Sequence, residues 1–244
     1  MRALTAAELL AVWERGQGRP PLDRALLLVA AASPGRSAEA AASLSIGERD
    51  AELLTLREWM FGKTMESMVT CSRCGERLEM AFNVSDMRAE VPDGGSDEPA
   101  MSVSGYELQF RIPNSTDVGA VCGLSEPELQ RRALFERCLI SIRRNGQPAT
   151  ADQLTSDVMD AVAARMAELD PQADLRLNLT CPTCQHRWQA AFDIVSFLWS
   201  EIESWAWRIL REVHILASAY GWSERDILSL SAGRRKWYLE MVGA

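Results

Sequence analysis

Two segments of this chain repeat each other, and each contains two cysteines separated by two residues. The first segment covers residues 69–84 and the second covers residues 179–194, with a constant offset of 110 positions (181 minus 71). The four cysteines are Cys71, Cys74, Cys181 and Cys184. One such pair of thiolates can bind one side of a tetrahedral metal ion, and two pairs complete its coordination. The repeat therefore predicts that the chain leaves one half of a metal site and later returns with the other half.

Zinc is the metal that this spacing favours. Each cysteine pair precedes a strand-like apolar stretch, as in the β-hairpins of a zinc ribbon. A thioredoxin-like redox pair needs a thiol at the start of a helix instead. An iron–sulfur cluster also accepts four thiolates, and buried thiols without any metal are a further alternative. The sequence alone does not distinguish zinc from iron. Four thiolates leave no open coordination position, so a zinc ion here would be structural.

The other residues near the cysteines carry weaker signals. Gly75 follows the first pair, where a tight turn often requires a positive φ, and Gln185 takes the equivalent place in the second copy, where it should be less comfortable. His186 could in principle replace a ligand, but four thiolates make a role beside the site or at the surface the better interpretation. We expect Cys122 and Cys138 to be small buried apolar residues.

The composition restricts the classes of function. The chain has 244 residues, of which 47% are hydrophobic and 25% charged, as in ordinary soluble globular proteins. Its net charge of -8 opposes binding to nucleic-acid phosphates, although a zinc-ribbon nucleic-acid-binding or regulatory protein remains the alternative function. No signal peptide is visible, and charged residues interrupt the most apolar stretch, residues 194–220. We therefore expect a cytoplasmic protein without a membrane span. In the cytoplasm cysteines are kept reduced, and they bind metals more often than they form disulfides.

Local patterns predict a mainly α fold with small β elements, in which the two zinc-ribbon knuckles join N- and C-terminal helices. Capping boxes at Thr5–Glu8 and Ser45–Glu48, and Pro20-Pro21, predict helix starts. The expected regions are an N-terminal helical region (1–68), a first knuckle (69–84), an inserted α+β region (85–178), a second knuckle (179–194) and tryptophan-rich C-terminal helices (195–244).

The inserted region combines several signals. Residues 91–99 are polar and rich in turn-forming residues, which predicts a linker. Apolar residues alternate on both sides of Gly105, which predicts one or two half-buried strands. A helix is expected to begin near Pro127 and to continue through Ile142, followed by a turn at 145–146 and another helix ending near residue 169.

The C-terminal helices contain a surplus of tryptophan. We predict a partner-binding surface formed by Trp199, Trp205, Trp207, Trp222 and Trp237. These side chains cannot all point inward from one helix face, since Trp205 and Trp207 are about 200° apart around an α-helix. Exposed tryptophans are enriched at protein–protein interfaces.

No catalytic constellation accompanies these features. The chain lacks a phosphate loop, a dinucleotide-binding glycine pattern and a His-Glu-x-x-His motif. Its two histidines have no evident partners for a nucleophilic triad. We therefore expect a protein that is not an enzyme and whose function lies on surfaces that the metal holds in place.

Several motifs together resemble a known family. They are Trp13-Glu14-Arg15-Gly16, Arg24-Ala25-Leu26, 170–174 (DPQAD), 181–184 (CPTC), 192–194 (FDI), 197–202 (FLWSEI), 211–214 (REVH), 219–224 (AYGWSE), Arg234-Arg235 and Tyr238-Leu239. The pattern resembles the baseplate hub assembly chaperones of contractile-tailed phages and similar proteins of phage-derived contractile injection systems. The resemblance implies a non-enzymatic protein that helps to assemble, or joins, the baseplate hub, with hub or spike proteins as partners. It would act in the cytoplasm during assembly or stay in the assembled baseplate. Stoichiometry and oligomeric state are left open.

Overall fold

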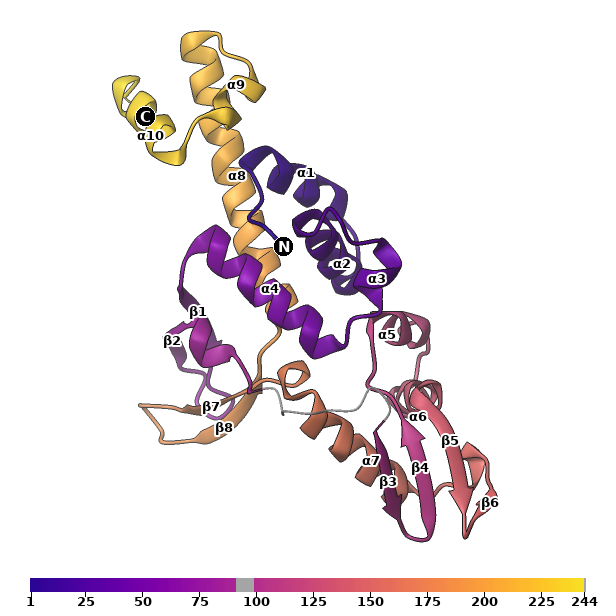
Figure 1. Cartoon of the computed structure of the whole chain (residues 1–244). Helices are drawn as coiled ribbons and strands as arrows, with labels where there is room; N and C mark the ends of the chain where they lie inside the picture. Colours follow the sequence, from indigo (N-terminus) through magenta and orange to yellow (C-terminus); the bar gives the residue numbers. More distant parts are fainter. Residues whose placement is uncertain (91–98, 244) are drawn as a thin grey trace.

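The computed structural model describes residues 1–90 and 99–243 (Figure 1). The predicted linker at 91–99 therefore lies, except for Pro99, outside the described residues. The helices are α1 (Ala6–Gly16), α2 (Pro21–Ala32), α3 (Ala38–Ala42), α4 (Ile46–Phe61), α5 (Ser115–Val121), α6 (Pro127–Cys138), α7 (Ser156–Leu169), α8 (Ile194–Tyr220), α9 (Glu224–Ser229) and α10 (Ala232–Met241). The strands are β1 (Thr64–Thr70), β2 (Arg77–Asn83), β3 (Ala100–Val103), β4 (Tyr106–Phe110), β5 (Leu139–Arg144), β6 (Gln147–Pro148), β7 (Arg176–Thr180) and β8 (Arg187–Ala191).

These elements confirm a mainly helical fold with small antiparallel sheets. Strands β1 and β2 form one hairpin and β7 and β8 form another, while β3 to β6 form a four-stranded sheet in sequential order. No helix in residues 1–90 or 99–243 is long and apolar enough to cross a membrane.

Helix α8 is the axis around which the main core is built. Helices α1, α2 and α4 pack along its first half, and α9 and α10 lie at its far end (Figure 1). Its buried face carries residues spaced three and four apart, as an amphipathic helix requires: Ile194, Val195, Leu198, Trp199, Ile202, Ala206, Ile209, Val213 and Leu216. The helix ends at Gly221, whose φ of 68° is the predicted left-handed cap.

The predicted capping boxes are present at the starts of α1 and α4. Thr5 accepts a hydrogen bond from the Glu8 N–H, and the Glu8 carboxylate accepts the Thr5 N–H in return. Ser45 and Glu48 repeat the arrangement at α4. Each box satisfies two N–H groups that a helix start otherwise leaves without partners, so both helix starts are determined by local sequence.

An ion pair between a buried arginine and a partly exposed glutamate joins α4 to α8. The Arg57 side chain is only 2% exposed, and its Nε and Nη2 donate to the two Glu201 carboxylate oxygens at 2.8 and 2.6 Å. Its Nη1 donates to the Gly62 carbonyl at 2.8 Å. The guanidinium also lies 5.7 Å from the centre of the Phe197 ring. Every part of this buried cation therefore has a polar or aromatic neighbour.

Trp199 is a core residue, which corrects its prediction as part of the partner surface. Only 4% of it is exposed, because its indole ring packs against the end of α1 at Gly16. The Arg24 guanidinium covers the ring at 4.5 Å from its centre. The sequence does not show that α1 would cover Trp199, because Gly16 and Trp199 lie far apart in the chain.

The Gly16–Trp199 contact leads to a testable expectation. A Cβ atom at residue 16 would lie 2.1 Å from Trp199 Cη2, so Gly16→Ala must displace the indole ring. Overpacking of this kind typically costs about 1–3 kcal/mol. Urea unfolding should show this loss. Gly233→Ala is the matched control: its Cβ would meet nothing within 4 Å in α10, so it should stabilise the helix by about 0.5–1 kcal/mol. Equal effects of the two changes would contradict the packing argument.

The inserted region has its own small core. Strand β4 places Tyr106, Leu108 and Phe110 in one cluster with Phe135 of α6 and Val162 of α7. The predicted strands around Gly105 are present as β3 and β4, joined by a tight turn in which Ser104 and Gly105 have φ values of 50° and 78°. Positive φ at both central residues is typical of type I′ hairpin turns.

The helix predicted to continue through Ile142 is wrong in its second part. Helix α6 ends at Cys138, and Leu139 begins strand β5. In that strand Leu139 pairs with Phe110 and Ile142 pairs with Leu108. The apolar spacing fitted a helix, but pairing with β4 extends the sheet instead, so a tertiary contact overrode the local pattern. Asn145-Gly146, predicted as a turn, joins β5 to β6 with φ values of 50° and 78°.

Two side chains attach the end of the inserted region to the main core. Asp170 accepts a hydrogen bond from the Gly47 N–H at 2.9 Å, at the start of α4. The buried Gln172 side chain accepts the Ala89 N–H at 2.8 Å and donates to the Met87 carbonyl at 3.0 Å. The chain is thus fixed beside the end of the first hairpin just before it enters the second.

Candidate metal centre

Each cysteine pair lies at the turn of a β-hairpin, one between β1 and β2 and the other between β7 and β8. The two turns have the same hydrogen bonds. In each, the N–H of the first cysteine donates to the carbonyl five residues later, and its carbonyl accepts the N–H four residues later. The N···O distances are 2.8 and 3.0 Å in the first turn and 2.9 and 2.9 Å in the second. The sequence repeat is therefore also a structural repeat.

The turns differ at the position after the second cysteine. Gly75 has a φ of 76°, and Gln185 adopts a φ of 57° at the equivalent place. A residue other than glycine in this region is strained, as expected for Gln185 from the sequence. The Gln185 side chain compensates in part, since its amide donates to the Pro182 carbonyl at 3.0 Å within the same turn.

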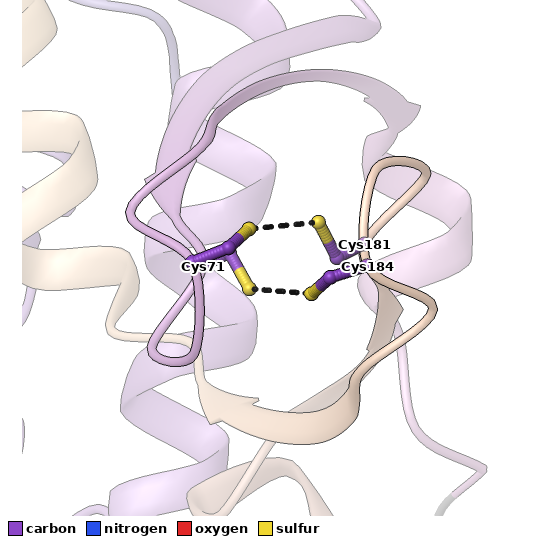
Figure 2. A group of neighbouring side chains, drawn as sticks. Cys71, Cys181 and Cys184 are labelled. Atoms are coloured by element: carbon purple, nitrogen blue, oxygen red, sulfur yellow. Dashed lines mark hydrogen bonds between the residues drawn. The ribbon is translucent and has the colours of Figure 1, made fainter.

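The two turns face one another and bring all four thiols together (Figure 2). Cys71 Sγ lies 3.8 Å from Cys184 Sγ, and Cys74 Sγ lies 3.6 Å from Cys181 Sγ. All four sulfur atoms are within 4.8 Å of one another. A zinc ion bound tetrahedrally at about 2.3 Å from each sulfur would separate neighbouring sulfurs by about 3.8 Å. The donor set and its spacing therefore fit a four-thiolate metal site.

The thiols do not ionise equally in this cluster. Burial opposes ionisation of Cys71, but the N–H groups of Cys74 and Arg73 and the neighbouring thiols donate to its sulfur and lower its pKa to about 7. For Cys74, the Glu76 N–H favours the thiolate, but Cys184, burial and Cys181 oppose it and raise the pKa to about 12. Ionisation of Cys71 is therefore favoured over ionisation of Cys74. A divalent cation is what four thiolates in this space require.

The hairpins also meet at their bases. Phe82 at the end of β2 and Phe192 after β8 are equivalent in the repeat, and their rings contact edge to face with centres 5.9 Å apart. Phe197 of α8 packs against both rings. Each hairpin has only two strands, which rarely persist alone in water. The four thiols at the tips and the three rings at the bases therefore hold the pair of hairpins together and against α8.

The remaining predicted positions have separate environments. His186 is half-buried and stacks on Trp188 with ring centres 5.6 Å apart, outside the group of four cysteines. Cys138 is buried as predicted, and burial raises the pKa of its thiol to about 11. Cys122 is exposed, which corrects the prediction that it is buried, because it follows the end of the short helix α5 at the surface. Neither cysteine pair begins a helix, so the arrangement differs from that of a thioredoxin-like pair.

The predicted tryptophan surface divides into exposed and packed residues. Trp207 is 63% exposed on α8 and Trp237 is 62% exposed on α10. Trp205 is half-buried against the main core, and Trp222 stacks on Tyr220 with ring centres 4.6 Å apart. The sequence reasoning missed Met241, which is 74% exposed and lies one helical turn after Trp237. The spacing of four residues was the available signal for this second apolar residue on the same face.

Comparison with known proteins places most of these elements in one family. Residues 29–199, from within α2 to the first turns of α8, match the family model described as T4 bacteriophage base plate protein. No curated protein and no solved structure matches the chain. The matched range contains both hairpins, the inserted region and all four clustered cysteines, whereas Trp207 and Trp237 follow it in sequence.

Proposed function

The chain belongs to the family of T4 bacteriophage base plate proteins, and on that premise we propose that it is a non-enzymatic, zinc-stabilised adaptor or assembly factor for the baseplate hub of a contractile tail or injection system. Family membership supports the broad role, a structural or assembly function in a phage baseplate. The finer role rests on the arrangement of the four thiols and of the exposed tryptophans. Protein–protein contacts with hub or spike proteins are the proposed activity.

The observation that carries the proposal is the convergence of the four cysteine sulfurs between two hairpins. Cys71, Cys74, Cys181 and Cys184 would hold a structural zinc ion and leave it no open position for substrate. The inserted region leaves and returns through these hairpins, which adjoin the start of α8 (Figure 1). A metal here fixes the inserted region relative to the helical core, and this is the property an adaptor between two partners needs.

The exposed tryptophans supply the proposed contact surface. Trp207 lies beside Trp13 of α1, with ring centres 5.7 Å apart, and still exposes most of its surface. Trp237 and Met241 form a second exposed apolar pair on α10. Large aromatic side chains of this kind dominate the binding energy of many protein interfaces. We propose that Trp207 and Trp237 form the centre of the partner surface, and that the half-buried Trp205 and Trp222 are further contact residues.

The surface is tested by substitution. Trp207→Ala and Trp237→Ala, each co-expressed with the hub and spike proteins of the same phage or injection system, should weaken the complex by roughly 10- to 100-fold, as expected for interface tryptophans. Affinity is measured by titration of the purified partner. Leu129→Ala is the control, since Leu129 is 50% exposed on α6 of the inserted region. If both tryptophan variants bind a hub protein as tightly as the wild-type chain, the interface does not include these tryptophans. If the wild-type chain forms a complex with none of the hub and spike proteins, the proposed function is wrong.

A second measurement separates two forms of the proposal. Mass spectrometry of purified particles should detect the chain if it is a resident component of the baseplate. A chain that is required for assembly but absent from finished particles would be a transient chaperone. Either result is compatible with an assembly role, and together with the binding data it decides between the two.

A further inference from the structure

A groove between the two hairpins has the properties of a binding site for an extended polypeptide. It measures about 430 Å³ and runs beside the cluster of thiols. One wall is formed by residues 76–80 at the start of β2, and the other by Leu179, Thr180, Pro182 and Thr183 of β7 and the second turn. The two walls come from separate sheets, since β2 and β7 are not paired with each other.

The wall formed by β2 is a free strand edge. At the two ends of this hairpin, the N–H of Cys71 donates to the backbone carbonyl of Glu76, and the N–H of Val84 donates to the backbone carbonyl of Lys63. Hydrogen-bonded positions alternate along an antiparallel strand, so Leu78 and Met80 direct their backbone groups toward β1. By the same alternation, Arg77 and Glu79 direct their N–H and C=O groups away from β1. Within the described residues no further strand pairs with this edge.

The side chains of the groove define the chemistry of an occupant. Leu78, Met80 and Leu179 are half-buried and provide an apolar floor. Glu76 and Glu79 are exposed at its rim, and Glu66 lies diagonally across the hairpin from Glu79. Arg77 is exposed between the two glutamates, and its guanidinium donates to Met68 Sδ of β1 at 3.0 and 2.7 Å. In the described part of the chain none of these three carboxylates forms an ion pair. An occupant with apolar side chains on one face and lysine or arginine beside them would satisfy both features.

We propose that this groove binds an extended, basic segment of a partner baseplate protein, which adds a strand to the edge of β2. The added strand would form backbone hydrogen bonds with Arg77 and Glu79, seat apolar side chains on Leu78, Met80 and Leu179, and place basic side chains near Glu76 and Glu79. Strand addition of this kind obtains affinity from the backbone and specificity from alternate side chains. The inference rests on the proposed function, and it assigns a second contact remote from the tryptophans.

The thiol cluster adjoins this groove. Pro182 and Thr183, which form its second wall, lie between the two cysteines of the second turn. The separation of the walls therefore depends on how Cys181 and Cys184 are held against the first turn. Binding of the segment should decrease when the metal is removed from the full-length protein by a chelator, even where the helices remain folded.

The test uses site-specific photo-crosslinking. The photoreactive residue p-benzoylphenylalanine is placed at Thr183 in the groove, and separately at Trp207 on the tryptophan surface, in the full chain co-expressed with the neighbouring baseplate proteins. Peptide mapping should locate the Thr183 cross-link in a segment that contains lysine or arginine and alternating apolar residues. A cross-link from Trp207 but none from Thr183 would overturn the groove and leave the proposed function intact. Cross-links from neither position would count against both.

Matched proline variants test the strand pairing itself. Glu79→Pro removes an N–H that points away from β1 at the groove edge, whereas Thr64→Pro removes an N–H from the opposite, outer edge of the same hairpin. Glu79→Pro should reduce the Thr183 cross-link by at least fivefold, and Thr64→Pro should leave it unchanged. Metal content and melting temperature show that each variant retains its fold. Equal effects of both prolines, a Thr183 cross-link to a second copy of this chain, or one to an acidic segment would each overturn the proposal.

Discussion

Cys181→Ser is expected to abolish metal binding and cooperative folding together. Cys181 is buried between the hairpins, and its sulfur lies 3.6 Å from that of Cys74. Structural zinc in small four-ligand sites contributes about 10–16 kcal/mol of apparent binding free energy at neutral pH. Most domains have a net stability of only about 5–15 kcal/mol. Loss of one ligand therefore removes a term as large as the whole stability, and the thermal unfolding transition should broaden or disappear.

The measurements are metal content by atomic emission spectrometry and thermal unfolding by circular dichroism. The purified wild-type chain should contain one zinc ion per molecule, and a chelator should lower its melting temperature. Cys122→Ser is the matched control because Cys122 is exposed and lies outside the cluster. Cys122→Ser should change neither the metal content nor the melting temperature. A wild-type protein that carries no metal and melts at the same temperature as Cys181→Ser would contradict the zinc site, and iron in place of zinc would change the metal but not the architecture.

Glu201→Ala should be the most damaging substitution outside the metal site. Among the described residues, it leaves the almost fully buried Arg57 guanidinium with the Gly62 carbonyl and the Phe197 ring as its remaining partners. Removal of one partner from a buried ion pair typically costs about 3–5 kcal/mol, because the remaining charge stays buried without compensation. Urea unfolding at neutral pH should show this decrease in the free energy of unfolding.

Two companion variants make the result specific. Glu203→Ala changes an exposed glutamate on the same helix and should alter stability by less than about 0.5 kcal/mol. The double variant Arg57→Met, Glu201→Leu removes both charges and should recover most of the loss, since apolar replacement of a buried pair is often neutral or stabilising. If the double variant is as unstable as Glu201→Ala alone, the loss of stability comes from lost side-chain packing and not from the unpaired charge of Arg57.

The sequence predicted those features that local chemistry determines. Capping boxes fixed the starts of α1 and α4, and the cysteine repeat indicated the paired turns, down to the strained φ of Gln185. In each case the residues that carry the sequence pattern lie within a few positions of the backbone feature that they predict. The close approach of the two turns was also expected, because a tetrahedral site needs ligands from both copies.

The wrong predictions for β5 and Trp199 concern contacts between residues that are far apart in the sequence. Strand β5 was predicted as helix because the position of Leu139 and Ile142 beside β4 is a contact across about 30 residues, which apolar spacing does not reveal. Trp199 was assigned to the surface because the packing of Gly16 against its ring joins the two ends of the chain. The groove between β2 and β7 could not be predicted from the sequence for the same reason, since its walls come from different hairpins.

The separation of the two hairpins in sequence has a consequence for synthesis. The first cysteine pair leaves the ribosome 110 residues before the second (181 minus 71). At translation rates of about 5–20 residues per second, roughly 5–20 seconds pass between them. During that interval the nascent chain carries two of the four clustered thiols, and its N-terminal helices lack α8 to cover them. The late arrival of the second turn therefore sets an order: a metal ion can be bound by all four thiols only after residue 184 has been made.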